Sequence, residues 1–330
     1  MDDTLYGTRD KRGNWKPNKL PKRAPVFVWP VQPRAFLLWL LGYLKYHSLS
    51  AAVALVAWVY LTPPLETMRE FSVGWVSLIL VRNAALALLV YGGLHTVLYI
   101  QRRQQTEFKY NAKWPDTDNP TFLFGSQTAE NVFWTMCSGV PVWTAYEVLT
   151  WWMFANGYIR YTDFRTQPSY LIMLMLLVPM WYVLHFYVIH RLIHVGPLYH
   201  IIHKVHHNNV NPGPWSGLSM HTFEHIVYFS SVLIYFVVPS NPLHAMFALM
   251  EAALSPARGH AGFDRIAIDD GKYINNCTYF HYLHHKYFEV NYGTQLIPLD
   301  EWFGTAHDGS PEADEAMYSR LKAKKYARRA

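Results

Sequence analysis

Long apolar stretches with few charged residues constrain the fold of this chain more than any other feature of its sequence. Only 16% of its 330 residues are charged and 51% are hydrophobic, whereas soluble domains carry about a quarter charged residues. A helix needs about 20 consecutive, predominantly apolar residues to cross a bilayer. We therefore expect an all-α membrane protein rather than a soluble globular domain.

Four segments are apolar enough to predict about four transmembrane helices. They run from Ala35 to Leu61 across a polar break at residues 45–47, from close to Arg82 to near Ile100, over about 132–157, and over about 169–189. A further apolar region at 226–256 is split by Pro-Ser-Asn-Pro into halves that are too short to span. This region predicts a hairpin that dips into the membrane or packs on the helical bundle.

The distribution of basic residues predicts the orientation of the chain. The net charge is +6, and Lys and Arg gather in the first 34 residues, after Ile100 and at the C-terminus. Short basic loops stay on the cytosolic side, and the pattern suits an anionic membrane surface better than nucleic acid. We therefore expect both termini in the cytosol. The predicted parts are a basic cytosolic arm (1–34), a four-span bundle (35–189), a cytosolic, helical, histidine-rich cap (190–310) and a basic tail (311–330).

Histidines gather directly after the fourth apolar segment and again near the end of the cap. His190 and His194 form an i, i+4 pair, and two i, i+3, i+4 triples follow, which share a helix face; the triples are His203, His206, His207 and His281, His284, His285. The Gly196–Pro197 break allows the first two groups to converge, since one unbroken helix would turn them apart. Eight imidazoles exceed the four-ligand shell of one zinc ion, so two metal ions fit the count.

The residues alone leave several interpretations of these histidines open. Imidazole suits zinc, copper, iron and nickel, so the ligand type does not select the metal. Lipid C–H bonds resist acid–base chemistry, and their oxidation calls for a redox metal and O₂, which favours iron. A proton relay would recruit Asp or Glu inside the spans, where these residues are nearly absent. A zinc-binding or non-catalytic membrane metalloprotein is the alternative from another functional class.

The histidine stretches and their surroundings resemble the fatty acid hydroxylase / sterol desaturase superfamily of integral-membrane, non-haem di-iron oxygenases. The matching stretches are HRLIH at 190–194, LYHIIHKVHH at 198–207, RGHAGFD at 258–264, HYLHH at 281–285 and NYGTQLIPLDEWFGT at 291–305. The resemblance covers about 180–305 clearly and the first half of the chain only in layout. One stretch departs from the family pattern, since Ala261 and Phe263 stand where Ser and Tyr are usual.

The resemblance implies a four-helix membrane bundle with a cytosolic cap that binds two iron ions. It implies O₂-dependent hydroxylation or desaturation of a sterol, fatty acyl chain or other lipid. Electrons would come from a separate protein resembling cytochrome b5 or a ferredoxin. The implied ligands are His190, His194, His203, His206, His207, His281, His284 and His285, with His260 as the ninth.

Several other side chains are candidates for a supporting role. His221, His225, Glu224 and Asp264 are candidates either to bind metal or to orient a ligand, and Asp300 is either a similar carboxylate or the cap of a turn. Among the remaining histidines, His185 is expected to pack in the core and His200 to pack or to support a ligand. His95 and His244 are expected to satisfy polar groups or to line a substrate path, and His47 and His307 carry no signal.

Overall fold

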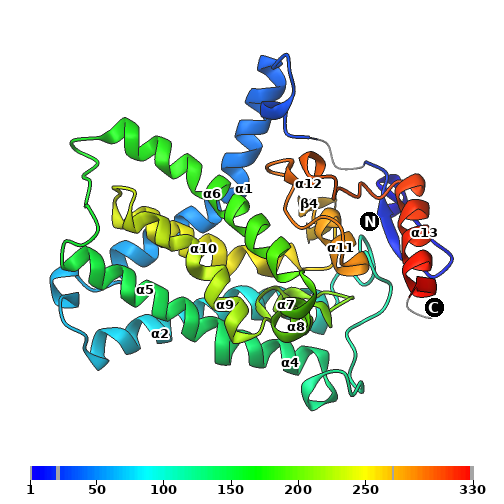
Figure 1. Ribbon diagram of the computed structural model, residues 1–330, viewed down its shortest axis with the longest axis horizontal. Coiled ribbons are helices and arrows are strands. Elements are labelled where there is room, and N and C mark those ends of the chain that lie inside the picture. The colour runs from blue at the N-terminus through cyan, green and yellow to red at the C-terminus, as the bar shows by residue number, and fades with distance from the viewer. Residues whose placement is uncertain (1, 20–22, 270, 328–330) are drawn as a thin grey trace.

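The computed structural model is mostly helical and describes residues 2–19, 23–269 and 271–327 (Figure 1). Residues 1 and 20–22 of the predicted arm and 328–330 of the predicted tail lie outside these ranges. Three helices in the described part are long and apolar enough to cross a membrane, namely α1 (Pro33–Tyr60), the helix Val73–Ile100 and α6 (Pro168–Ile193), and Thr222–Phe236 is a shorter apolar helix. The predicted class, an all-α protein with about four apolar helices, is confirmed.

The second apolar helix begins earlier than the sequence predicts. It consists of α2 (Val73–Ala87), η4 (Leu88–Gly92), α3 (Gly93–His95) and η5 (Thr96–Ile100). The prediction that it starts close to Arg82 is wrong, because Arg82 is buried and forms an ion pair with Glu147. A charge that is paired within the bundle does not end an apolar helix.

The predicted third span is helical but less apolar than the other three. It forms α4 (Gln127–Trp134), η7 (Thr135–Gly139) and α5 (Val140–Ala155), and it is not one of the three long apolar helices. Its polar side chains Thr144, Glu147 and Thr150 are buried. These side chains lower the hydropathy of the segment, and they face protein rather than lipid.

Helix α10 (Pro242–Gly259) lies at the centre of the molecule and is buried along most of its length. It packs against α1, α5, α6 and η9 (Pro214–Leu218). The preceding segment, α9 (Thr222–Phe229) and η10 (Ser230–Phe236), contacts α5, α6 and α10. The apolar region that begins near residue 226 therefore packs on the bundle, and α10 carries its buried face directly to His260.

Both ends of the chain lie on the side of the molecule that carries α13 (Figure 1). The arm forms β1 (Gly7–Arg9) and β2 (Trp15–Pro17), and Trp15 packs against Phe108 and Tyr110. The other elements of the chain are η1 (Asp3–Leu5), η2 (Pro25–Phe27), η3 (Leu65–Met68), η6 (Leu123–Gly125), α7 (Gly196–Leu198), η8 (Tyr199–His203), α8 (Lys204–His207), β3 (Arg265–Asp269), β4 (Lys272–Asn275), α11 (Tyr279–Tyr287), α12 (Leu299–Trp302) and α13 (Pro311–Ala327).

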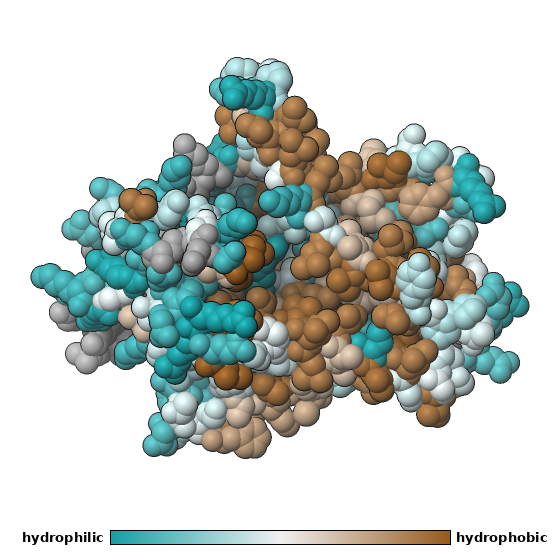
Figure 2. Space-filling view, turned by 180° about the vertical axis from the view of Figure 1, so that it is seen from behind, coloured by the Kyte–Doolittle hydropathy of each residue, from teal (hydrophilic) through white to brown (hydrophobic). Residues whose placement is uncertain are grey.

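The surface divides into an apolar and a hydrophilic part. Figure 2 shows hydrophobic residues gathered over the half of the molecule away from α13, and hydrophilic residues over the side that carries α13 and the termini. Exposed apolar side chains such as Leu38, Leu55, Val81 and Leu89 lie on the long apolar helices. An apolar surface of this kind is suited to contact with lipid.

Candidate metal centre

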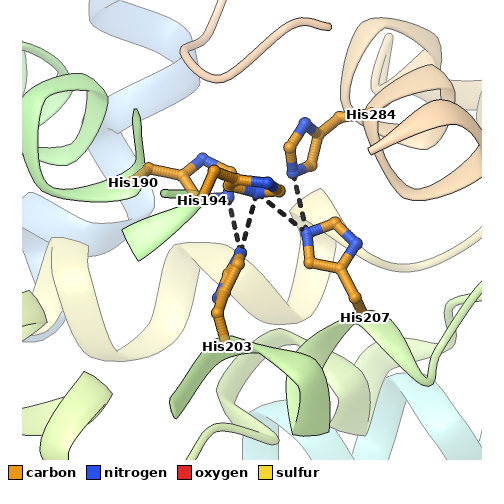
Figure 3. A group of neighbouring side chains, drawn as sticks. All are labelled: His190, His194, His203, His207 and His284. Carbon is orange, nitrogen blue, oxygen red and sulfur yellow. Dashed lines mark hydrogen bonds between the residues drawn. The ribbon is translucent and has the colours of Figure 1, made fainter. Parts of the chain in front are cut away.

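Nine histidines converge into two adjacent groups at the C-terminal end of α6. The larger group contains His190, His194, His203, His207 and His284, and the smaller contains His206, His260, His281 and His285. In the larger group the rings come from three directions and their nitrogens point to one centre (Figure 3). The groups adjoin each other, since the ring centroids of His207 and His285 lie 5.1 Å apart.

The two histidine triples are each divided between the two groups. His203 and His207, an i, i+4 pair, belong to the larger group, while His206 between them belongs to the smaller. In the later triple the pair His281 and His285 belongs to the smaller group and His284 to the larger. Each triple therefore contributes to both groups, whereas the sequence spacing suggests one common point for each triple.

The break after α6 brings the first histidines together, as the sequence predicts. Helix α6 ends at Ile193, and Val195 adopts an extended backbone before α7 begins at Gly196. The next turn, η8, is a π-helix over Tyr199–His203, which shifts the angular position of the residues after it. As a result, Nε2 of His203 lies 3.0 Å from Nε2 of His194 and 3.1 Å from Nε2 of His190.

Hydrogen bonds at Nδ1 fix the ring orientation of several of these imidazoles. Nδ1 of His190 donates to the Tyr292 carbonyl at 2.6 Å, Nδ1 of His284 donates to the Val290 carbonyl at 2.6 Å, and Nδ1 of His260 donates to the Pro256 carbonyl at 3.0 Å. A carbonyl only accepts, so the proton of each neutral ring lies on Nδ1. The lone pair of Nε2 then points into the group, which is the arrangement of metal-binding histidines.

The spacing of the Nε2 atoms fits a cation between them. In the larger group the Nε2 atoms of His207 and His284 are 3.0 Å apart, and in the smaller group those of His281 and His285 are 3.2 Å apart. Metal–nitrogen bonds of about 2.1 Å at right angles separate two ligands by about 3 Å. Lone pairs that face one another this closely repel unless a positive charge lies between them, so both groups fit a bound metal ion.

Burial keeps these imidazoles in the neutral form that metals require. Burial, reinforced by the neighbouring histidines, lowers the pKa of the following side chains well below the usual range: His203, His206, His207, His281, His284 and His285. Burial also lowers the pKa of His260 to about 4. Protonation therefore does not compete with metal binding at neutral pH.

The NYG stretch at 291–293 holds His190 through the backbone carbonyl of Tyr292. Asn291 donates its side-chain amide to the carbonyls of Phe280 and His307, which anchors the loop that carries Tyr292. Asp300 accepts hydrogen bonds from the backbone N–H groups of Tyr292 and Gly293 at 2.9 and 2.8 Å. Asp300 thus caps a turn and, by the same contacts, positions the carbonyl that His190 binds.

The candidate supporting residues differ in where they lie. Oε1 of Glu224 lies 2.7 Å from Nδ1 of His203, so Glu224 orients this histidine. All four candidates lie outside both groups, and the other three do not contact a histidine of either group in the same way. His221 caps α9, His225 uses both ring nitrogens on Ser138 and the Leu218 carbonyl, and Asp264 accepts from the Tyr110 hydroxyl.

The remaining histidines include one that sequence reasoning missed. His95 stacks on Tyr99, His185 bonds Ser230, His244 bonds the Leu171 carbonyl and His307 stacks on Tyr287, while His200 is exposed. His47, which carried no sequence signal, lies 2.9 Å from Glu251 of α10. No local pattern connects these two residues, which are 204 positions apart.

A cavity of about 700 Å³ extends from both histidine groups between α1, α6 and α10. Its wall includes His190 and His203 of the larger group and His206, His260 and His281 of the smaller group. Most of the remaining wall is apolar or aromatic, including Trp39, Val183, Phe186 and Met220. This volume is in the range of ligand pockets, and it brings a bound molecule to both groups at once.

The segment that contains all nine histidines is similar to a known protein family. Residues 172–305 match the family model described as Fatty acid hydroxylase. No solved structure shows significant similarity to this chain.

Individual relatives cover the same part of the chain. A Delta(7)-sterol 5(6)-desaturase of Aspergillus fumigatus is 31% identical over 160 residues, which are 41% of this chain and 48% of that protein. A Delta(7)-sterol 5(6)-desaturase of Gibberella zeae is 31% identical, over 39% of this chain and 40% of that protein. A Dictyostelium discoideum protein that carries the name methylsterol monooxygenase is 30% identical, over 37% of this chain and 46% of that protein. This chain thus spans about half or less of the length of these relatives.

Proposed function

This chain belongs to the fatty acid hydroxylase family, and from the geometry of its histidine groups we propose that it is a membrane-bound di-iron oxygenase that oxidises a C–H bond of a lipid. The observation that carries this proposal is the single apolar cavity that reaches histidines of both groups. A metal centre that only stabilises the fold needs no such cavity, because structural metal sites are closed.

In this proposal the ligands are five imidazoles for one ion and four for the other. The convergence of their Nε2 atoms supports this assignment. The proposed ligands of the first ion are His190, His194, His203, His207 and His284, and those of the second are His206, His260, His281 and His285. The chemistry that bound iron supplies is the activation of O₂ for attack on a C–H bond.

The protein contributes binding, orientation and exclusion of water. Glu224 and the carbonyls of Tyr292, Val290 and Pro256 hold four imidazoles with Nε2 directed inward. The aromatic and aliphatic wall of the cavity holds a lipid chain or ring next to the histidines and keeps bulk water away. These side chains decide which carbon of the substrate lies beside the metals.

The proposed substrate is a sterol or another apolar lipid, and the proposed reaction is hydroxylation or desaturation. Relatives with 30–31% identity carry the names of a sterol desaturase and a methylsterol monooxygenase. Both reactions begin with removal of hydrogen from carbon and differ in whether oxygen is then added or a second hydrogen is removed. Both also consume O₂ and a pair of electrons, which we propose come from a separate protein resembling cytochrome b5 or a ferredoxin.

We propose that the metal centre and both termini face the cytosol. Lys and Arg gather in the arm and in the segment after Ile100, as expected for cytosolic segments. The arm packs on that segment, since Arg9 donates to the Thr106 carbonyl and Trp15 contacts Phe108. Tyr110 in turn bonds Asp264 of the cap, so these basic segments and the histidine cap lie on one side of the molecule.

The proposed function is tested by comparing the lipids of cells with and without this protein by mass spectrometry. We expect a lipid that gains an oxygen atom or loses a pair of hydrogens only in cells that produce the protein. Metal analysis of the purified protein belongs to the same experiment. Stoichiometric zinc together with an unchanged lipid profile would overturn the oxygenase proposal and favour a zinc-binding membrane protein.

A further inference from the structure

The cavity contains a buried acid–base pair that the metal centre does not use. Its wall includes Glu251 of α10 and His47 of α1, and Oε1 of Glu251 lies 2.9 Å from Nδ1 of His47. We propose that this pair is a binding site for the hydroxyl group of a neutral lipid, which would hold the substrate at a second point away from the metals. The inference rests on the proposed function for the meaning of the cavity, but the binding it predicts is measured without turnover.

The pair lies well apart from the histidine groups. Glu251 precedes His260 by nine residues on α10 and its C-terminal cap, and a helix rises by about 1.5 Å per residue, which gives about 13 Å along the axis. A hydroxyl bound at Glu251 would therefore lie about two and a half helical turns along α10 from His260.

One carboxylate oxygen of Glu251 has no partner among the described residues. The Glu251 side chain is 3% exposed, and its Oε2 atom is buried without a hydrogen bond. A buried, unpaired acceptor is costly, and charged groups at membrane depth usually have a function. Since Glu251 lines the cavity, we expect its unpaired oxygen to take the missing hydrogen bond from a bound molecule.

A second buried glutamate in the same chain shows what a purely structural role looks like. Both oxygens of Glu147 are used, since Oε1 accepts from Arg82 and Trp151 and Oε2 accepts from Asn83 at 3.0 Å. Glu147 does not line the cavity. The contrast between the fully bonded Glu147 and the half-bonded Glu251 favours a ligand for Glu251 over a role only in joining α1 to α10.

The position of His47 is also fixed by its surroundings. Its ring meets the rings of Tyr43 and Tyr46 edge to face, with centroids 4.7 and 4.9 Å away. All three side chains line the cavity. The imidazole that orients Glu251 is therefore held in place before any ligand binds, which lowers the entropy lost on binding.

The end of the cavity at Glu251 suits a neutral hydroxyl better than an anion. The oxygens of the Glu251 side chain accept hydrogen bonds, so they favour a donor and disfavour a carboxylate or a phosphate beside them. Arg23 also reaches the cavity wall, but its guanidinium pairs with Glu301. A hydroxyl is small and uncharged, and it supplies the one donor that the free Oε2 atom lacks.

The test measures binding of 1-hexadecanol and its methyl ether to the full-length protein in detergent, without reductant. The two probes differ in one substituent, since a methyl group replaces the hydroxyl hydrogen in the ether. We expect 1-hexadecanol to bind about tenfold more tightly, because the ether cannot donate to Glu251. Equal affinities in the wild-type protein would overturn the inference without any variant, and tighter binding of hexadecylamine than of the alcohol would overturn the assignment to a hydroxyl.

The double substitution His47→Phe with Glu251→Met supplies the second measurement. It removes both partners together, so no unpaired buried charge remains and the protein is expected to fold. We expect the preference for the alcohol to fall from about tenfold to about onefold. The matched control, Arg82→Met with Glu147→Leu, removes a buried pair outside the cavity and keeps the preference. A preserved preference in the His47/Glu251 variant would contradict the assignment, whether or not oxidised lipid is found in cells.

Discussion

Oε1 of Glu224 lies 2.7 Å from Nδ1 of His203, and both side chains are almost completely buried. As a carboxylate, Glu224 accepts a hydrogen bond from Nδ1 of His203, so the lone pair of Nε2 is directed toward His190 and His194. Burial raises the pKa of Glu224, and a cation held by the neighbouring imidazoles would stabilise its charged form. The contact thus links a carboxylate outside the histidine groups to the proposed metal affinity.

Replacing Glu224 by Ala is predicted to weaken metal binding in the larger histidine group by about 10–100-fold, because His203 loses the partner that orients it. Glu224→Gln keeps an acceptor oxygen and should recover most of the affinity. Metal titration of the two purified variants tests this prediction. An unchanged affinity in Glu224→Ala would show that His203 needs no such support.

His206→Ala is predicted to abolish lipid oxidation while the protein remains in the membrane, because the smaller group falls from four imidazoles to three. His200→Ala is the matched control, since His200 lies in the adjoining helical turn but is exposed and outside both groups. Product formation in cells and the membrane content of each variant are the two measurements. Full activity of His206→Ala would remove His206 from the ligand set.

Asp300→Ala is predicted to reduce metal content and to destabilise the cap by about 1–3 kcal/mol, since buried donors lose their acceptor. The lost contacts are those to the N–H groups of Tyr292 and Gly293 and to the Thr305 hydroxyl. The substitution acts on His190 through the Tyr292 carbonyl. Glu301→Ala, at the exposed neighbouring position, should leave metal content and thermal unfolding unchanged. The prediction fails if both variants behave alike in these two measurements.

The local spacing of the histidines was sufficient to predict that they converge. It was not sufficient to predict which histidines belong to the larger group and which to the smaller. The break near Pro197 and the i, i+4 pairs are visible in the sequence, because both depend on the geometry of one helix. The separation of His206 from His203 and His207 depends on where α10 places His260 and where α11 places His281 and His285. Those positions result from packing between distant segments, which spacing along one helix does not encode.

The two buried acid–base pairs escaped prediction for a related reason. In the sequence, Arg82 indicates the edge of a membrane span, and His47 belongs to a polar break in the first apolar segment. Each contacts a buried glutamate from a distant helix, Glu147 for Arg82 and Glu251 for His47. A charged residue inside an apolar segment thus indicates a partner elsewhere in the bundle, and only the tertiary structure identifies that partner.

Arg82→Met alone is predicted to destabilise the protein by about 3–5 kcal/mol, because it leaves the Glu147 charge buried and unpaired. Combining it with Glu147→Leu should recover much of the loss, since the pair is then replaced by apolar side chains of similar size. Thermal unfolding in detergent measures both effects. A double variant that is no more stable than Arg82→Met would contradict this account of the pair.

The central claim is that the nine converging histidines hold two redox-active metal ions. Anomalous X-ray scattering at the iron absorption edge, from crystals of the full-length protein, tests it most directly. We predict two iron peaks, one among the Nε2 atoms of His190, His194, His203, His207 and His284, and one among those of His206, His260, His281 and His285. A single peak, or the absence of iron from both groups in protein that is active on lipid, would contradict the claim.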